Sequence, residues 1–94
     1  MSEQAAAASA PKALDHVVST DFEGGEGVLV DLNTKKYYHL NETAMLVWRG
    51  LEKGKGFDEI VGEMMGEYDI TPDRARESVD KILKTFQSFK LVGR

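Results

Sequence analysis

The 94-residue sequence has no cysteine, and it is also poor in proline and histidine, with two residues of each. Without cysteine the chain has no disulfide, no thiolate metal ligand and no redox motif. His16 and His39 have no partner at metal-ligand spacing, and no serine stands in a nucleophile-elbow motif. No apolar stretch approaches the roughly 20 residues that cross a bilayer. We therefore expect no enzymatic activity, no metal or cofactor site and no membrane association.

Charge is distributed unevenly along the chain, whose formal net charge is −4. Residues 1–70 carry six Lys and Arg against thirteen Asp and Glu, whereas residues 71–94 carry six against three. An acidic protein is a poor candidate for general nucleic-acid binding, because phosphate contacts need an excess of basic residues. The basic last segment leaves one alternative open, a winged-helix DNA-binding domain that reads DNA with its third helix.

Residues 1–13 have no periodic apolar pattern and are expected to form a disordered tail ahead of one domain over residues 14–94. The first residues carry no basic region, and the alanines after them are too weakly hydrophobic for a secretory signal. We therefore expect a cytoplasmic protein.

Three short segments are typical of antiparallel strands. Residues 15–22 are rich in β-branched side chains, and the glycines of residues 24–27 mark a turn. Gly27–Asp31 and Lys36–Leu40 then form a predicted hairpin, with residues 32–35 as its reversal.

Three helical patterns follow the strands. Asn41 can cap the first helix, and Thr71 followed by Pro72 is a strong start signal for the third. Each helix has one apolar face at i, i+3, i+4 and i+7 spacing. The residues expected on these faces are Ala44, Val47, Trp48, Leu51; Ile60, Val61, Met64, Met65, Tyr68; and Ala75, Val79, Ile82, Leu83, Phe86. After the last helix, Phe89, Leu91 and Val92 are expected to make apolar contacts. The predicted fold class is α+β, a three-stranded antiparallel sheet followed by three helices.

The aromatic strand Lys36–Leu40 points to binding rather than catalysis. Tyr37 and Tyr38 put large rings on both faces of a short strand, so at least one ring is expected to face outward unless both pack against helices. If this strand is a sheet edge, its free N–H and C=O groups are a template for strand addition. The added strand is either a partner peptide or a second copy of the chain.

A polar stripe borders the apolar face of the third helix. Its members are Arg74, Ser78, Lys81 and Thr85. The stripe suits an acidic peptide or a phosphate backbone, or it is a solvated flank with the ion pairs Glu77–Lys81 and Asp80–Lys84. On the first helix, Leu46 points away from the apolar face and is either an ordinary exposed leucine or a contact with a partner protein.

The order and spacing of several short motifs resemble the PqqD-like family. These motifs are VLVDLNT at residues 28–34, YYHLNETA at 37–44, VW at 47–48, FDEIV at 57–61, YDI at 68–70 and TPD at 71–73. Each motif is short, but their order is specific, and together they extend the resemblance over roughly residues 15–92.

The resemblance implies a small winged-helix-like domain that acts as a peptide chaperone, also called a RiPP precursor peptide recognition element. Such proteins bind the leader segment of a ribosomally synthesised precursor peptide and deliver it to a modifying enzyme, often a radical SAM protein. In the family, the leader adds as a strand beside the third strand and lies toward the third helix.

Carried onto this chain, the resemblance predicts a peptide site on the third strand and the third helix. Its residues are Lys36, Tyr37, Tyr38, His39 and Leu40 on the strand, and Arg74, Ser78, Lys81, Ile82 and Thr85 on the helix. Ile82 is expected at the floor of the groove, with Arg74 and Lys81 at its rim. One departure is Lys35, which stands in the hairpin turn where many members have glycine.

Overall fold

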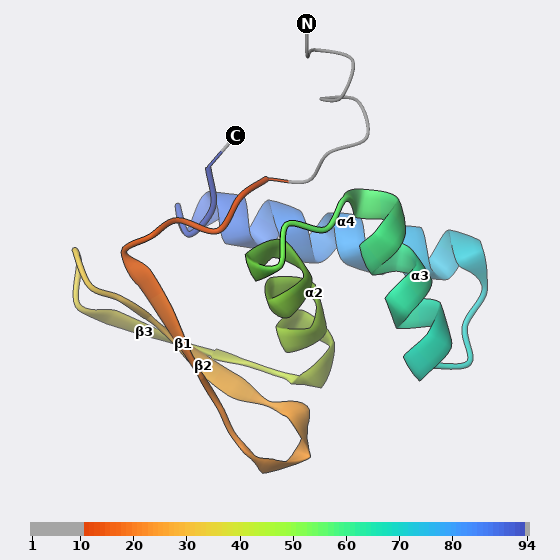
Figure 1. Ribbon diagram of the computed structural model, residues 1–94, viewed down its shortest axis with the longest axis horizontal. Coiled ribbons are helices and arrows are strands. Elements are labelled where there is room, and N and C mark those ends of the chain that lie inside the picture. Colours follow the sequence, from red (N-terminus) through yellow and green to blue (C-terminus); the bar gives the residue numbers. More distant parts are fainter. Residues whose placement is uncertain (1–10, 94) are drawn as a thin grey trace, which may run out of the picture.

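The computed structural model describes residues 11–93, in which three strands are followed by three α-helices (Figure 1). The strands are β1 (Val17–Asp21), β2 (Gly27–Asp31) and β3 (Lys36–Leu40), and a 3₁₀ turn, η1 (Glu23–Gly25), joins β1 to β2. The helices are α2 (Glu42–Glu52), α3 (Phe57–Glu67) and α4 (Pro72–Ser88). The predicted α+β class and the order of its elements are therefore confirmed.

The sheet is antiparallel, with β2 in the middle and β3 at one edge. Its register pairs Leu29 with Tyr38 and Val30 with Tyr37. Because alternate residues of a strand face opposite sides, the first pair faces the helices and the second faces away from them. Leu29 is accordingly fully buried, whereas Tyr37 is 74% exposed. Within residues 11–93 the sheet is covered on one face only, and one row of β3 backbone groups has no strand beside it.

Helix α2 packs closely on the covered face of the sheet because residue 27 is glycine. A Cβ atom at Gly27 would lie 2.7 Å from the sulfur of Met45 and 2.7 Å from the carbonyl oxygen of Thr20. Met45 is fully buried over this glycine. Met45 is not on the apolar face predicted for α2. In the structure this helix is covered by the sheet on one side and by α3 and α4 on others. Its buried surface is therefore wider than a single stripe.

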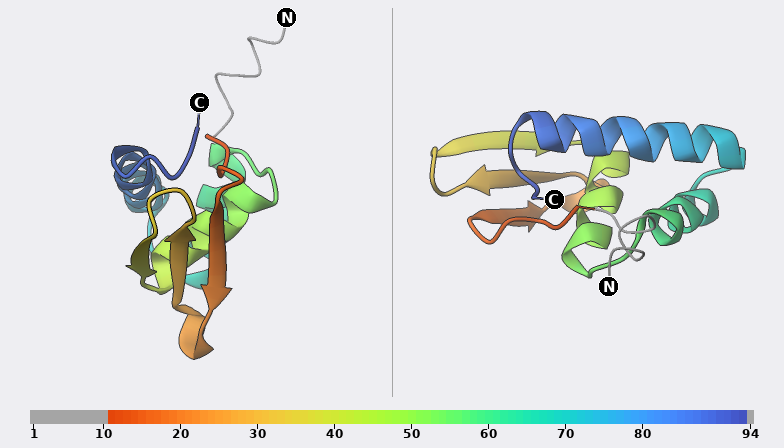
Figure 2. Two further views of the ribbon diagram at one scale, coloured as in Figure 1. Left: turned by 90° about the vertical axis from the view of Figure 1, so that its left-hand side faces the viewer. Right: turned by 90° about the horizontal axis from the view of Figure 1, so that it is seen from above.

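Trp48 of α2 lies at the centre of the core. Its ring is fully buried and meets the ring of Phe86 edge-to-face, with centroids 5.4 Å apart and an angle of 89° between the planes. This contact holds α4 against α2. The first half of α4 lies against α3 and its second half lies beside β3 (Figure 2). The aromatic pair therefore sets the distance between α4 and the sheet.

Two apolar residues differ from their predicted exposure. Met65, which the sequence places on an apolar helix face, is 37% exposed. Phe89 is 46% exposed but makes the predicted apolar contact, with the ring of Tyr38. Leu46 is partly buried against the core rather than pointing outward, because α3 folds over this side of α2 and brings Gly66 and Tyr68 to the same hollow. The suggested role of Leu46 as a contact with a partner protein stays a prediction.

Two of the helices begin at the side-chain caps that the sequence predicts. The Asn41 Oδ1 accepts a hydrogen bond from the Ala44 N–H at 2.9 Å, and the Thr71 Oγ1 accepts one from the Arg74 N–H at 3.3 Å. Each cap satisfies one N–H of the first turn that has no partner within the helix. Pro72 occupies the first turn of α4, as its fixed φ angle favours.

The two ends of the described chain pair with each other. Ala13 and Val92 form an isolated antiparallel bridge, and the Gly93 N–H donates to the Lys12 carbonyl at 2.8 Å. The Leu14 N–H likewise donates to the Leu91 carbonyl at 3.2 Å. Lys12 and Ala13, part of the tail in the sequence prediction, thus take part in this pairing, and residues 1–10 lie outside the described residues.

Helices α2 and α3 cross at Gly50, and this contact gives a prediction about stability. A Cβ atom at Gly50 would lie 2.7 Å from Cγ1 of Ile60, whose side chain is fully buried and has little room to move. We expect Gly50→Ala to lower the free energy of unfolding by about 1–3 kcal/mol, although alanine is the better helix former. Urea denaturation measures the change.

The matched control is Gly62→Ala in α3, where a Cβ atom would have no neighbour within 4 Å. This variant is expected to raise the free energy of unfolding by roughly 0.5–1 kcal/mol through helix propensity alone. If both variants stabilise the protein, the close crossing of α2 and α3 at Gly50 is wrong.

Candidate functional site

A groove of about 450 Å³ lies between β3 and the second half of α4, which run side by side in Figure 2. We call it the β3–α4 groove. Its lining contains no Lys, Arg, Asp or Glu, and its few polar residues are His39, Asn41, Thr85 and the two tyrosines. A groove of this kind can take apolar side chains, while the edge of β3 can take a backbone.

The ring of Tyr38 forms one wall of the groove, in contact with the ring of Phe89 just after α4. Their centroids are 4.9 Å apart, and the planes are tilted by 34°. Tyr38 faces the helices because it pairs with Leu29, and Phe89 remains 46% exposed although it touches Tyr38. An exposed aromatic ring beside a free strand edge gives a peptide apolar surface to cover.

Tyr37 and His39 lie on the other face of β3. Tyr37 is the outward-facing ring that the sequence predicts, so the alternative in which both tyrosines pack against helices is wrong. The His39 side chain is 60% exposed, and its Nε2 lies 3.1 Å from Oε1 of Glu26. Its ring centroid is 6.5 Å from that of Phe22. His39 therefore takes part in a surface contact between β3 and the β1–β2 connection.

The structure brings six of the predicted site residues to the lining of the β3–α4 groove. They are Tyr37, Tyr38, His39, Leu40, Ile82 and Thr85. Arg74, Ser78 and Lys81 are not part of the lining. Arg74 begins the half of α4 that packs against α3, eight residues before Ile82 and thus about 12 Å along the axis. Lys81 is exposed beside Ile82, and its carbonyl accepts from the Thr85 hydroxyl at 3.1 Å.

Five lining residues were not among the predicted site residues. They are Asn41, Ala44, Phe86, Phe89 and Leu91. Ala44 and Phe86 carry an apolar signal in the sequence, but periodicity assigns them to the core and does not distinguish a core face from a groove floor. Phe89 and Leu91 follow α4, where a helical period no longer predicts direction. Their proximity to β3 follows from the tertiary position of α4.

A second hollow of about 500 Å³ lies at the turn end of β3, and we call it the turn pocket. It shares Tyr38 and Phe89 with the β3–α4 groove, so the two hollows flank this aromatic pair. Its remaining lining comes from the turn after β2, from the segment before β1 and from the residues after α4. These are Leu14, His16, Asp31, Asn33, Thr34, Lys36, Ser88 and Lys90. Of the predicted site residues, Lys36 lies here.

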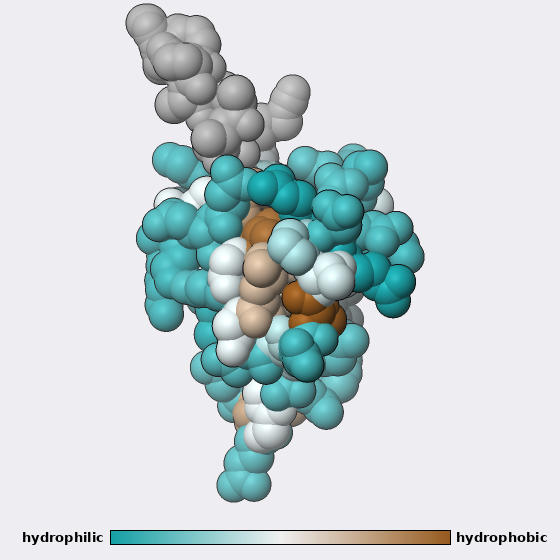
Figure 3. Space-filling view, turned by 90° about the vertical axis from the view of Figure 1, so that its right-hand side faces the viewer, coloured by the Kyte–Doolittle hydropathy of each residue, from teal (hydrophilic) through white to brown (hydrophobic). Residues whose placement is uncertain are grey.

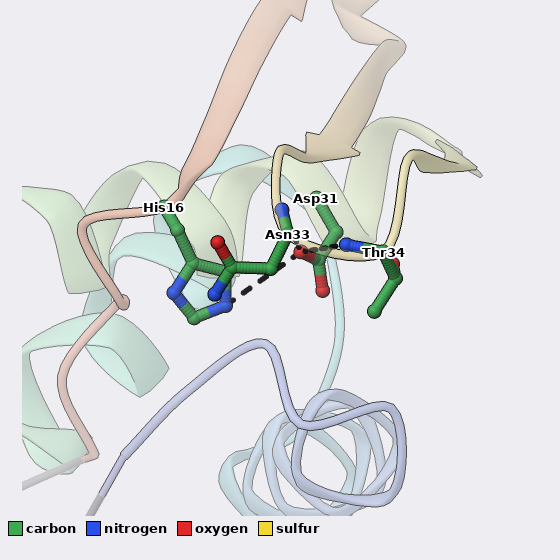
Figure 4. A network of polar contacts seen from close by, with 4 residues as sticks. All are labelled: His16, Asp31, Asn33 and Thr34. Carbon is green, nitrogen blue, oxygen red and sulfur yellow. Dashed lines mark hydrogen bonds and ion pairs between the residues drawn. The ribbon is translucent and has the colours of Figure 1, made fainter.

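Asp31 organises the turn beside this pocket (Figure 4). Its carboxylate is 5% exposed and accepts the N–H groups of Asn33 at 2.9 Å and Thr34 at 3.2 Å, while Nε2 of His16 lies 3.7 Å away. Burial by itself raises the pKa of Asp31, but the backbone donors of Thr34 and Asn33 and the charge of His16 outweigh burial. The pKa of Asp31 is therefore lowered from its ordinary value.

A third hollow of about 580 Å³ lies between α2 and α3, and it holds Leu46. Its rim carries charges of both signs, among them Glu42, Arg49 and Glu67. On the adjoining face, a strip of pale and brown residues is bordered by hydrophilic ones (Figure 3). Met65 and the exposed glycines Gly62 and Gly66 belong to the surface of α3. Unlike the β3–α4 groove, this hollow has no strand edge beside it, and its lining is charged.

Within residues 11–93, no three His, Asp or Glu side chains gather as metal ligands would. In the same part of the chain, no helix has both the length and the apolar composition needed to cross a bilayer.

Comparison with known proteins adds a family to this geometry. The family model described as "Coenzyme PQQ synthesis protein D (PqqD)" matches residues 26–92, from the start of β2 to the last paired residues. The chain belongs to the PqqD family. The resemblance seen in the sequence motifs is thus confirmed over more than two thirds of the chain. A search of curated protein sequences finds no match.

Two solved structures share the architecture of this PqqD-family chain. One, described as TbiB1 in complex with the TbiA(beta) leader peptide, has a TM-score of 0.80 and 30% sequence identity, covering 86% of this chain and 93% of its own. The other, a lasso peptide synthetase B1 complexed with the leader peptide, has a TM-score of 0.78 and 18% identity, covering 88% and 96%. The second likeness concerns the fold alone.

The lowered pKa of Asp31 predicts how the stability of the turn depends on pH. Because the folded-state pKa lies below the unfolded one, ionised Asp31 stabilises the fold fully above the ordinary aspartate pKa of about 3.9. This stabilisation is lost as the pH falls through the folded-state pKa. In Asp31→Asn, the amide oxygen can still accept both N–H groups but no longer titrates.

We therefore expect the difference in unfolding free energy between wild type and Asp31→Asn to be constant near neutral pH and to shrink below about pH 4. Thermal and urea unfolding at a series of pH values measure it. Parallel stability curves for the two proteins down to acid pH would contradict the role given to Asp31.

Proposed function

We propose that this PqqD-family protein is a non-catalytic peptide chaperone. It binds the leader segment of a ribosomally synthesised precursor peptide as an added strand along β3 and presents it to a modifying enzyme. The observation that carries this proposal is the β3–α4 groove, in which a free strand edge and an uncharged, largely apolar cavity lie side by side. The similar solved structure at 30% identity, described as a complex with a leader peptide, supports it.

The two parts of the groove have different roles in this proposal. Main-chain hydrogen bonds to the edge of β3 supply affinity that is largely independent of leader sequence, because every peptide has the same backbone. Side chains that enter between Tyr38, Ile82 and Phe86 supply selectivity by burying apolar surface. A flexible leader loses conformational entropy on ordering, so we expect a dissociation constant of roughly micromolar order.

The peptide-binding residues proposed from the sequence then divide by position. Tyr37, Tyr38, His39, Leu40, Ile82 and Thr85 line the groove. The side chains of Tyr37 and His39 lie on the other face of β3, so in the proposal these two residues act through the strand edge. Lys36 lies at the turn end, whereas Arg74, Ser78 and Lys81 lie along α4 outside the lining and have a secondary role in the proposal. In the proposal, the modifying enzyme, a radical SAM protein in the expectation from the family, receives the leader from this cytoplasmic chaperone. The free edge of β3 also permits pairing with a second copy.

The DNA-binding alternative has no observation in its favour. Helix α4 carries four basic and three acidic residues, so its net charge is only +1. Two of its basic side chains already have acidic neighbours, with Lys84 3.0 Å from Asp80 and Arg76 3.5 Å from Asp58. A helix that reads DNA needs unpaired basic residues along one face.

The first test is an NMR amide titration with the leader of a precursor peptide encoded beside this gene. We expect shift changes concentrated in β3, along the Ile82–Phe86 side of α4 and at Phe89, as strand addition at the groove requires. Changes centred on α3, or none in β3, would contradict the proposal. A duplex DNA added in place of the leader tests the alternative, since DNA binding would shift α4 and weaken steeply with salt.

The second test is the variant Phe89→Ala, which removes an exposed wall of the groove. We expect affinity for the leader to fall about tenfold, because an aromatic contact at the centre of a peptide site contributes on the order of 1–2 kcal/mol. Phe89 is already 46% exposed, so the melting temperature should change little. Met65→Ala is the matched control, an apolar residue on α3 that is 37% exposed and lies outside the groove. Equal affinities for both variants would place the leader elsewhere.

A further inference from the structure

Among residues 11–93, two non-glycine residues have a positive φ angle, and both are lysines: Lys35 at 66° and Lys90 at 60°. Side chains disfavour this left-handed conformation, which usually selects glycine. Lys35 is the last residue of the β2–β3 turn, and its N–H donates a hydrogen bond to the Asp31 carbonyl at 2.7 Å. Backbone conformation therefore does not explain why lysine occupies these two positions.

Lys90 occupies the position after α4 where glycine is most favoured. The Lys90 N–H donates to the Gln87 carbonyl and the Leu91 N–H to the Phe86 carbonyl, each at 3.0 Å. These are the two bonds of a Schellman motif, in which the left-handed residue is commonly glycine. A residue kept in a disfavoured conformation is a reason to look for function nearby.

Both lysines lie at the turn end of β3. Lys90 lines the turn pocket together with Lys36, and Lys35 adjoins two lining residues, Thr34 and Lys36. Within the described residues, none of the three lysines has an ion-pair partner. The acidic group in the lining, Asp31, is nearly buried and already accepts two backbone N–H groups, and His16 stands beside it.

The two hollows beside β3 thus differ in charge. The β3–α4 groove has no Lys, Arg, Asp or Glu in its lining, whereas the turn pocket has two lysines that lack an ion-pair partner among the described residues, with a third lysine beside them. The protein as a whole is acidic, with a net charge of −4, so this local excess of positive charge is not an average property of the surface. This excess of positive charge lies at the turn end of the β3 edge.

We infer that the turn pocket recognises an acidic side chain of the bound leader, through Lys36 and Lys90 with Lys35 beside them. The inference rests on the proposed function and adds the chemical class of leader that this chain selects. The leader carries an apolar side chain for the β3–α4 groove and an Asp or Glu for the turn pocket. The two hollows lie on one side of β3 and flank Tyr38, so these two leader residues face the same way.

Strand geometry limits their spacing. Side chains on one face of a strand are two residues apart, and Leu40 lies four residues after Lys36 in the five-residue strand β3, about 13 Å along it. The acidic and the apolar leader residues are therefore two or four positions apart. In an antiparallel pairing, which would continue the pattern of this sheet, the acidic residue follows the apolar one in the leader.

The test is selection of binding peptides from a displayed random library against the full chain. We expect enriched peptides to carry an apolar residue with Asp or Glu two or four positions away. Selection against Lys36→Glu or Lys90→Glu should abolish the acidic preference, and a selected peptide whose acid is changed to its amide should bind wild type about three- to fivefold more weakly.

Lys53→Glu is the matched control, because Lys53 also follows a helix C-terminus and carries the same charge but lies outside both hollows. Peptides selected against Lys53→Glu should contain Asp or Glu as often as those selected against wild type. Enriched peptides without acidic preference, or the same loss in Lys53→Glu, would overturn the inference while leaving peptide binding intact. A library from which no peptide is enriched would contradict the proposed function itself.

Lys90→Gly separates recognition from structure. Glycine relieves the left-handed conformation, so the melting temperature should rise or stay unchanged while the acidic preference weakens. A lower melting temperature with an unchanged acidic preference would show that Lys90 serves the end of α4 instead.

Discussion

The contact between Trp48 and Phe86 determines where α4 lies, and the candidate site depends on that position. Trp48 comes from the helix that rests on the sheet, and Phe86 from the helix that borders its edge. Because the two rings are buried and meet edge-to-face, α4 cannot move toward β3 or away from it without opening the core. The width of the β3–α4 groove is therefore a property of the core. The rigid aromatic pair gives a peptide a preformed site, which lowers the entropy lost by the protein on binding.

The sequence was sufficient to predict the elements of this fold and one wall of the site. The strand-forming residues of Gly27–Asp31, the aromatic strand Lys36–Leu40 and the capped helix starts are local signals, and the structure has all of them. Leu46 and Met45 were misjudged because their burial depends on how many neighbours cover α2, which a single helical period does not contain. Phe89 was expected to make apolar contacts but could not be assigned to the groove, since it lies beyond the last helical turn and meets Tyr38 only through tertiary packing.

The helical part of the predicted site shows a further limit of pattern analysis. Arg74 and Ile82 lie on one helix, and spacing alone gives no sign of where that helix leaves one neighbour and meets another. In the structure the change occurs within α4, whose first half serves α3 and whose second half serves the groove. The positive φ angle of Lys90 has no signal in the residue pattern, because lysine is not a residue that indicates a left-handed conformation. For Lys35 the one signal is the family resemblance, in which many members have glycine in this turn.

The pairing of Lys12 with Gly93 has a consequence for how this domain can be joined to others. The two ends of the described chain lie side by side, so the domain can be fused to another protein at either end or inserted into one of its loops. An enzyme tethered at this point would share the domain's bound peptide at an effective concentration set by the tether length, whichever end carries it. Loading and modification could then become steps within one assembly, and their rate would no longer depend on how dilute the two proteins are.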